Sequence, residues 1–490
     1  MNRHTTVKKS LILLVAVIMC LAVLLTACNG KTFKRNFDAP KGGEVKSNGG
    51  IAVQYGEWIY YVNGYESNAN AENTYVNTND SPRVGSVVRI KAADIPAILA
   101  INDDDDLTTT ERAKAIAKAV DEKTQIVVPH VYYSTNTTTR SINGIYIFND
   151  RLYMLTPNDK LTAGGSTQTD QSVLMSFDLA GEHPQRHFTF ESNSAQIWLY
   201  EKEGKVMATY YMNSKLYVLE LTDSEKSAVK EITGEEETVA AINYDEAANC
   251  LFFLDGDGSI CKLDIGAKEK KVIIDNTVGD DGETSSITYA IVSVNAGYVY
   301  YTQADSNNSD VDNIVLYYVN TNVDGNYSSE IALHTTELNS KPIGWKDGKV
   351  VTIKPDGNYT GLEMITSADC KQRTLLLKPG FNESSISSDN MKIVGDELYY
   401  TAGGVMYVKN LNDFDSEEYG TPYGTSALNS TTGGWSTPDR LEVTIDGETH
   451  VYVFSLGTGT VSVVEFNAET KKDSTSAAFT KIVIVEEDED

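Results

Sequence analysis

Oxygen-bearing side chains gather in two short stretches of the sequence. The stretch "DSNNSDVDN" (305–313) offers Asp305, Asn307, Asp310 and Asp312, and "DGDGS" (255–259) offers Asp255 and Asp257. Calcium binds six to eight such oxygens around a sharp turn, but neither stretch has the twelve-residue spacing and terminal glutamate of the common calcium loop. We expect no cofactor, and we keep the four residues of the first stretch as candidate calcium ligands. A plain hairpin turn accounts for the glycines of the second stretch.

Histidine, serine and cysteine supply no recognisable catalytic motif. His183 and His187 in "HPQRH" have a spacing that suits a metal site on a helix, but Pro184 argues against that helix, and we interpret the stretch as a solvated loop. No Gly-x-Ser-x-Gly sequence occurs, and no serine or cysteine sits beside a histidine in a known local motif. The sequence therefore names no catalytic residue.

The cysteines outside the N-terminal segment are odd in number, so they do not indicate a set of paired disulfides. Cys20 and Cys28 lie near the N-terminus, which leaves Cys250, Cys261 and Cys370 in the rest of the chain. We predict buried free thiols at these three positions. A bridge between Cys250 and Cys261, which flank one turn, is the alternative.

The N-terminus has the composition of an export signal, since basic residues precede an uninterrupted apolar run from Leu11 to Leu25. The residues that close the run, Leu25, Thr26, Ala27 and Cys28, resemble the bacterial lipoprotein signal, which is cut just before the cysteine. The resemblance implies that residues 1–27 are removed and that Cys28 carries a diacylglycerol thioether and acyl chains such as palmitate. The protein would then be held on the extracytoplasmic face of the cell membrane. An uncleaved membrane-spanning helix is the alternative, because the run is nearly long enough to cross a bilayer.

Charge limits the partners of the protein. The formal net charge is −28, and loss of a signal containing Arg3, Lys8 and Lys9 makes the remaining chain three charges more negative. Such a surface repels nucleic acid and anionic lipid alike, so attachment to a membrane has to come from the acyl chains. Residues 28–50 lack a hydrophobic period and are rich in Lys, Gly, Asn and Ser, which predicts a flexible tether.

One hairpin pattern recurs along the chain. A Gly, Asn or Asp turn leads into a β-branched and aromatic run, and a second turn and a second run follow, as in "GDELYYTAGGVMYVKNL" (395–411). The pattern occurs with strand centres at Tyr60, Tyr153, Met207, Phe253, Tyr300, Val351, Tyr399 and Tyr452. Shorter apolar runs before and after each hairpin supply two more strands. Because hairpins that stack around an axis cover one another's apolar faces, we predict an all-β fold over residues 51–488. It is a β-propeller of about eight four-stranded blades; seven blades is the main alternative, and a pair of β-sandwiches is a more distant one.

The interval between the first two hairpins contains the only helical patterns. "ADIPAILAIN" (93–102) and "LTTTERAKAIAKAVDEKT" (107–124) both read as helices, and the second begins with a capping box of Thr108 and Glu111. We predict a helical insertion over residues 92–124, between the third and fourth strands of the first blade. It is a lid, a partner surface or a packing element on one rim, and we expect the blades to close without it.

The hairpin at 395–411 resembles the TolB-like propellers of exported bacterial proteins, and especially the uncharacterised propeller lipoproteins. It departs from WD-repeat blades, which carry Gly-His and Trp-Asp pairs. The resemblance implies binding or scaffolding rather than catalysis, and it transfers no functional residue, because the shared positions make turns and pack blades. We therefore expect a lipid-anchored, non-catalytic module that binds an envelope protein, peptide or glycan. The alternatives are an envelope hydrolase or lyase with carboxylates at the propeller channel, and a structural component of an envelope assembly machine.

Overall fold

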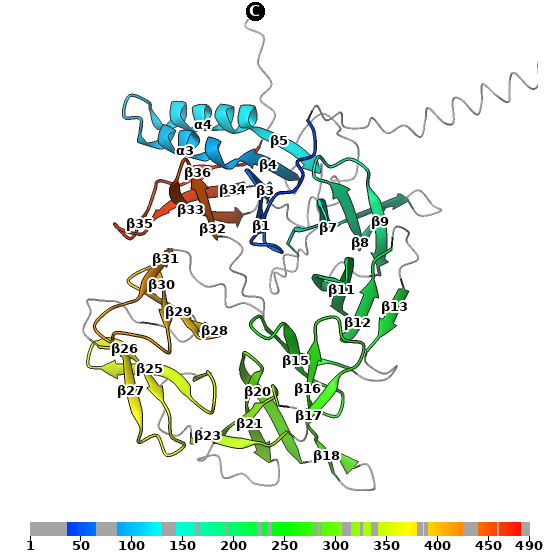
Figure 1. The fold of residues 1–490 in the computed structure, drawn as a ribbon, viewed down its shortest axis with the longest axis vertical. Coiled ribbons are helices and arrows are strands. Elements are labelled where there is room, and N and C mark those ends of the chain that lie inside the picture. The colour runs from blue at the N-terminus through cyan, green and yellow to red at the C-terminus, as the bar shows by residue number, and fades with distance from the viewer. Residues whose placement is uncertain are drawn as a thin grey trace, which may run out of the picture.

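A computed structural model gives the conformation of residues 37–64, 86–128, 144–161, 167–191, 195–222, 228–232, 238–278, 283–284, 286–305, 315–323, 327–334, 342–379, 386, 391–424, 440–457 and 460–481. In these residues, eight antiparallel sheets follow one another in chain order round a ring (Figure 1). Each sheet takes all of its strands from one continuous stretch of the chain. The protein is an eight-bladed β-propeller, which confirms the predicted fold and excludes the seven-bladed and sandwich alternatives.

Each blade has four main strands, which follow one another from the centre of the ring outwards. Blades 1 to 4 contain β2 (Ala52–Tyr55), β3 (Trp58–Val62), β4 (Val87–Lys91) and β5 (Thr124–Val128); β6 (Tyr146–Phe148), β7 (Arg151–Leu161), β8 (Thr167–Asp178) and β9 (Gln185–Phe190); β10 (Gln196–Lys202), β11 (Lys205–Met212), β12 (Lys215–Glu220) and β13 (Ala228–Glu231); and β14 (Ala240–Asp245), β15 (Cys250–Leu254), β16 (Ile260–Asp264) and β17 (Lys271–Ile274).

Blades 5 to 8 follow the same order. They contain β20 (Ile287–Asn295), β21 (Tyr298–Asp305), β22 (Val315–Asn320) and β23 (Glu330–His334); β24 (Ile343–Gly344), β25 (Val350–Asp356), β26 (Tyr359–Ile365) and β27 (Arg373–Leu377); β28 (Met391–Val394), β29 (Glu397–Ala402), β30 (Val405–Asn410) and β31 (Thr421–Gly424); and β32 (Arg440–Ile445), β33 (Glu448–Gly457), β34 (Thr460–Asn467) and β36 (Ala477–Ala478). Three short additions accompany the blades: β1 (Val45–Lys46) on the inner side of β2, β35 (Lys472–Asp473) beside β34, and a separate hairpin of β18 (Thr277–Val278) and β19 (Glu283–Thr284).

Turn residues explain the regularity of the blades. Because neighbouring strands are antiparallel, the turns between first and second strands all lie on one face of the ring, which we call the inner-turn face. In blade 3 this turn has φ 54° at Glu203 and 77° at Gly204, the positive values that a two-residue type I′ hairpin needs. The Gly, Asn and Asp residues of the repeated sequence pattern tolerate such values, so the pattern places the turns correctly.

Apolar side chains between neighbouring blades form the core. Tyr60, Tyr300 and Tyr452, three of the predicted strand centres, are completely buried. Separate clusters join blades 2 and 3, 3 and 4, 4 and 5, 5 and 6, and 6 and 7, and the largest cluster joins blades 8, 1 and 2. The recurring tyrosines therefore pack blades together.

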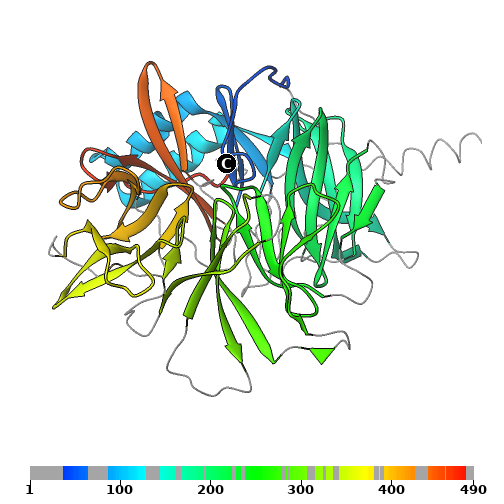
Figure 2. The ribbon, with the colours of Figure 1, turned by 60° about the horizontal axis from the view of Figure 1, so that its bottom comes forward.

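The helical insertion lies between β4 and β5, the third and fourth strands of blade 1, as predicted. It consists of η2 (Ala92–Asp94), α3 (Ile95–Leu99), η3 (Ala100–Asp103) and α4 (Thr109–Lys123). The capping box is confirmed: the Glu111 backbone N–H donates to Thr108 Oγ1 over 3.3 Å, and the Thr108 N–H donates to Glu111 Oε2 over 2.9 Å. In the turned view the helices stay beside blades 1 and 8 (Figure 2).

In the part of the chain that the structure describes, the ring closes between blades 8 and 1 without exchange of a strand. Tyr61 Oη donates to the Phe479 carbonyl over 2.9 Å, and the Lys481 N–H donates to Asn63 Oδ1 over 2.7 Å. Lys481 Nζ also donates to the carbonyl and to Oδ1 of Asp121 in α4, both over 2.7 Å. Five buried Ile, Leu and Val residues of the helices belong to the cluster that joins the two blades: Ile95, Ile98, Leu99, Ile116 and Val120. The helices thus cover the joint at which the ring is closed.

Part of the segment that was predicted to be a tether makes specific contacts. Ser47 Oγ donates to the Arg440 carbonyl of blade 8 over 3.3 Å, and Asn48 bonds the N–H and the carbonyl of Ile147 in blade 2. β1 pairs with β2 between these blades. Residues 45–50 therefore connect three blades. Within the described residues, no helix is long and apolar enough to cross a membrane.

Candidate functional site

Of the four candidate calcium ligands, only Asp305 lies in the part of the chain that the structure describes. Asp305 ends β21, where its Oδ1 accepts a hydrogen bond from Ser286 Oγ over 2.7 Å, whereas Asn307, Asp310 and Asp312 lie outside the described residues. No group of three or more His, Cys, Asp or Glu side chains in the described part of the chain is arranged to hold a metal. The calcium site at 305–313 stays a prediction, as does lipidation of Cys28, which is also outside the described residues.

The second acid-rich stretch is a hairpin turn with its own counter-ion. Asp255 Oδ1 accepts the N–H of Ser259 over 3.0 Å, and its Oδ2 accepts a hydrogen bond from Lys270 Nζ over 2.9 Å. The Lys270 ammonium therefore already neutralises the Asp255 carboxylate. This agrees with the interpretation of the stretch as a plain hairpin turn.

The two histidines of "HPQRH" have different environments. His183 is exposed and its Nδ1 lies 2.7 Å from Asp178 Oδ2. His187 is buried, with Nδ1 2.7 Å from the Thr222 carbonyl and Nε2 2.8 Å from Ser176 Oγ. The interpretation of this stretch as a solvated loop is therefore wrong for His187, which lies buried in β9 and serves blade packing, whereas His183 is exposed as expected.

Ser176 and His187 form the kind of contact that a serine hydrolase uses, and the sequence motifs did not reveal it. The residues lie on neighbouring strands, since Ser176 pairs with Gln185 in the β8–β9 ladder, so no local motif connects them. A carbonyl partner on Nδ1 makes Nε2 the acceptor of the serine hydroxyl in a neutral imidazole. However, Ser176 is 0% exposed and His187 only 3% exposed, so no substrate carbonyl reaches the hydroxyl. The pair fastens blade 2 to Thr222 of blade 3.

The three described cysteines are free and buried, as predicted. In the β15–β16 ladder Cys250 pairs with Asp264 and Cys261 pairs with Phe253, so the two thiols do not face each other and the disulfide alternative is wrong. Burial raises the pKa of Cys250 to about 12 and also raises the pKa of Cys261. Neither thiol is a nucleophile at neutral pH.

The joint between blades 7 and 8 differs from every other joint in the ring. Among the described residues, no hydrophobic cluster contains side chains of both blades; the small cluster on this face of blade 7 is formed by Tyr399 and Met406 with Val394, Val408 and Tyr423. Instead, the described contacts across this joint are made by cationic side chains of blade 8 on tyrosines of blade 7. Arg440 of blade 8 lies with Cζ 4.0 Å from the ring centre of Tyr423 and donates Nε to the Tyr423 carbonyl over 2.7 Å. Farther out, Lys471 Nζ lies 5.6 Å from the ring centre of Tyr407.

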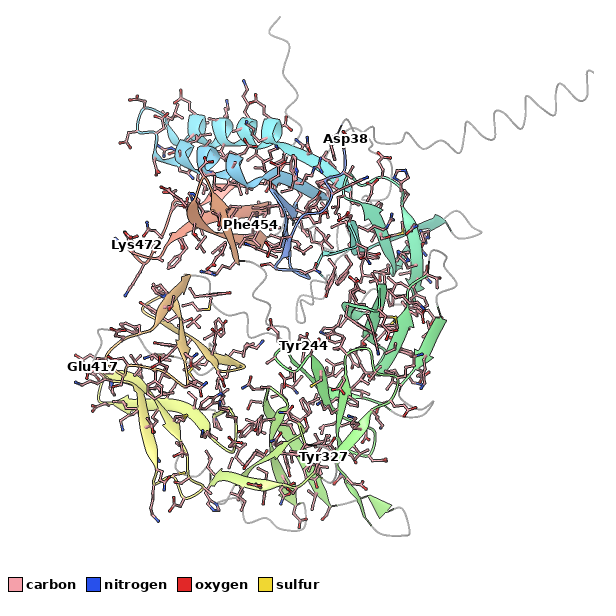
Figure 3. All side chains as sticks on the ribbon, viewed as in Figure 1. Asp38, Tyr244, Tyr327, Glu417, Phe454 and Lys472 are labelled. Atoms are coloured by element: carbon pink, nitrogen blue, oxygen red, sulfur yellow. The ribbon has the colours of Figure 1, made fainter. Side chains whose placement is uncertain are left out.

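A second polar contact reaches this joint from across the ring. Lys392 of β28 is the ladder partner of Tyr399, so it lies on the same face of blade 7. Its Nζ is 3.6 Å from Glu246 Oε2, at the end of the innermost strand of blade 4. Figure 3 shows Tyr244, two residues before Glu246, beside the centre of the ring. Burial lowers the pKa of Lys392 to about 8, although the nearby carboxylate of Glu246 acts in the opposite direction.

Together these side chains form one group, which we call the channel cluster: Glu246, Lys392, Glu397, Tyr399, Tyr423 and Arg440. Tyr399 Oη donates to Glu397 Oε2 over 2.7 Å, and the Tyr399 and Tyr423 rings meet edge to face with their centres 5.3 Å apart. The cluster combines two cations, two carboxylates and two tyrosines, of which Tyr399 is buried, and such groups suit recognition of a polar ligand. It combines the consecutive blades 7 and 8 with blade 4, which is distant in the sequence, and the only sequence indication of it is the general expectation of carboxylates at the channel.

Comparisons with known proteins add only general context. The sequence matches no protein-family model and no curated protein. Among solved structures it is similar to a puromycin hydrolase, with 10% identity and a TM-score of 0.33 over 69% of this chain and 53% of that one. It is also similar to a prolyl endopeptidase, with 12% identity and a TM-score of 0.36 over 79% of this chain and 54% of that one, and to the Dos1 propeller, with 12% identity and a TM-score of 0.37 over 86% and 93%. This chain thus spans about half of the first two proteins. At such identities no activity or partner transfers to this chain.

Proposed function

We propose that the protein is a lipid-anchored, extracytoplasmic binding module that recognises an envelope protein, peptide or glycan at the channel cluster. The export signal that ends at Cys28 supports the location, and the propeller fold supports a binding or scaffolding role. The channel cluster is the single observation on which the choice of site depends.

The composition of the cluster suits binding. Tyrosine and arginine are enriched where proteins bind partners tightly, because both combine a large contact area with a polar end. Tyr423 and Arg440 already contact each other across the joint, and Glu246 and Lys392 flank them with opposite charges. A peptide or sugar with both donors and acceptors finds partners here.

The position of the cluster also supports this role. Every other joint between neighbouring blades has an apolar core, which fixes the blades against each other. At the joint of blades 7 and 8, the described contacts are a hydrogen bond and cation–π contacts, which a polar ligand replaces without exposing an apolar core.

The test is capture of partners in cells. Wild-type protein and an Arg440→Gln variant are cross-linked in the native envelope and purified, and the attached proteins and glycans are compared. Arg440→Gln removes the cation above Tyr423, and we expect at least a tenfold loss of the specific partner. Lys205→Gln, an exposed lysine paired with Glu220 in blade 3, is the control and should retain it.

Melting curves must show that both variants are folded. An identical partner set for Arg440→Gln and wild type contradicts binding at this site. Turnover of an envelope polymer by the purified protein, with loss of activity in Glu246→Gln, favours the hydrolase or lyase alternative. Stable co-purification with an assembly complex in all variants favours the structural alternative.

A further inference from the structure

We infer that the propeller stands on the membrane with its inner-turn face toward the lipid surface and presents its opposite face away from it. The inference rests on the proposed anchor at Cys28. It depends on where the folded part of the chain begins.

The described chain is clamped from its first residue. The guanidinium of Arg89 lies between two aromatic rings, with Cζ 4.1 Å from the ring centre of Phe37 and 4.2 Å from that of Trp58. Arg89 Nη2 donates to the Asp38 carbonyl over 3.0 Å, and Nη1 donates to the Leu179 carbonyl of blade 2 over 3.2 Å. Arg89 is only 1% exposed, so this is a buried fastening for Phe37 and Asp38.

The clamp lies toward the inner-turn face at the outer edge of blade 1. Val45 pairs with Tyr55 at the end of β2, and the Gly56 N–H in the turn that follows donates to the Glu44 carbonyl over 2.9 Å. Residues 37–44 therefore precede β1 on the side of that turn. Figure 3 shows Asp38 at the periphery of the ring, beside blade 1.

The distance from Cys28 to the clamp is short. Eight residues separate Cys28 from Phe37 in the sequence, so the two are nine residue steps apart and at most about 30 Å from each other. A blade is comparably thick: the eight residues of β11 rise about 26 Å, before the turns at both ends are added. The opposite face can touch the bilayer only if the connection between Cys28 and Phe37 is fully extended along the blade. Any less extended connection holds the inner-turn face nearer to the bilayer than the opposite face.

Charge does not supply this orientation. Glu57 and Asp446, in the inner turns of blades 1 and 8, are exposed and repel anionic lipid, while Lys114 and Lys118 of α4 are exposed nearby. The length of the connection therefore sets the orientation, and added salt should change it little.

The experiment measures how near each face comes to the lipid. Protein lacking residues 1–27, with a hexahistidine tag in place of Cys28, is bound to phosphatidylcholine vesicles that contain a nickel-chelating lipid and an energy-accepting fluorescent lipid. A donor dye is attached to a single new cysteine, Glu203→Cys or Asn213→Cys. These positions are matched: both are exposed, they flank β11 at its two ends, and their φ values are 54° and 52°. The native cysteines that remain are buried.

We expect at least twofold more energy transfer from position 203 than from position 213. Thirty Gly and Ser residues inserted between residues 36 and 37 should make the two positions equal, since the longer connection no longer restricts the orientation. Equal transfer with the native connection, or more transfer from position 213, overturns the inference. The tag replaces the lipid, so this result does not depend on processing in the cell. Absence of a fatty acid on native Cys28 contradicts the anchor separately.

Discussion

Deletion of the helical insertion is the sharpest test of how the ring is closed. We expect that replacement of residues 92–123 by a short Gly/Ser linker unfolds the propeller, contrary to the expectation from the sequence that the blades close without it. The variant removes five buried Ile, Leu and Val side chains, Ile95, Ile98, Leu99, Ile116 and Val120, from the cluster between blades 8 and 1. At about 1.5–3 kcal/mol for each buried side chain, the loss is on the order of 10 kcal/mol. The whole free energy of unfolding of a domain is about 5–15 kcal/mol.

A graded variant keeps this test interpretable if the deletion protein is insoluble. Val120 is completely buried, so Val120→Ala should lower the free energy of unfolding by about 2 kcal/mol, through lost burial and the cavity that remains. Lys118→Ala, with its side chain 68% exposed two residues away, should change it by less than about 0.5 kcal/mol. Urea unfolding followed by circular dichroism measures both. A soluble deletion protein with a cooperative transition within about 2 kcal/mol of wild type refutes the argument, because the helices would then add little to closure.

Three further outcomes are expected. Because burial lowers the pKa of Lys392 to about 8, the native protein loses the proton of this lysine at a lower pH than the unfolded chain does. Between about pH 7 and 9.5, wild type should therefore gain about 2 kcal/mol in free energy of unfolding relative to Lys392→Met. Parallel pH profiles of the two proteins would contradict the buried position of Lys392. A calcium chelator should leave the melting temperature unchanged, whereas a drop of several degrees that Asp310→Ala abolishes would establish the site at 305–313. Cys28→Ala should abolish labelling by a fatty-acid probe and globomycin-sensitive processing in cells, and a wild type without label would contradict the lipoprotein interpretation.

Local signals in the sequence were sufficient for the blades. Strand centres such as Tyr300 and Tyr452 alternate with turn residues at a spacing that only a repeated sheet satisfies, and both are completely buried in the structure. The capping box of Thr108 and Glu111 is likewise a contact between residues three positions apart, which the sequence shows directly.

Contacts between distant blades could not be predicted in this way. Glu246 and Lys392 meet from opposite sides of the ring, and neither residue stands in a motif. From the sequence alone, Arg89 would be expected to be an exposed strand residue. In the structure, Phe37 and Asp38, the first described residues, cover it. The Ser176–His187 contact depends on the register of two strands, and its burial, which removes it from chemistry, depends on the neighbouring blade. Such features follow from how the blades pack, and a single sequence does not encode that packing in any local pattern.

The two unusual joints of the ring have one explanation. Blades 7 and 8 follow each other along the chain, so covalent continuity keeps them together, and their joint tolerates the absence of a shared apolar cluster among the described residues. Blades 8 and 1 stand at opposite ends of the propeller sequence and share no strand among the described residues, so the contacts that hold them together there are noncovalent. The largest cluster, the helices and the contacts of Lys481 are all found at that joint. The contacts that close the ring are therefore concentrated at the joint that the chain does not connect, whereas the joint of blades 7 and 8 carries the charged and aromatic residues of the proposed binding site.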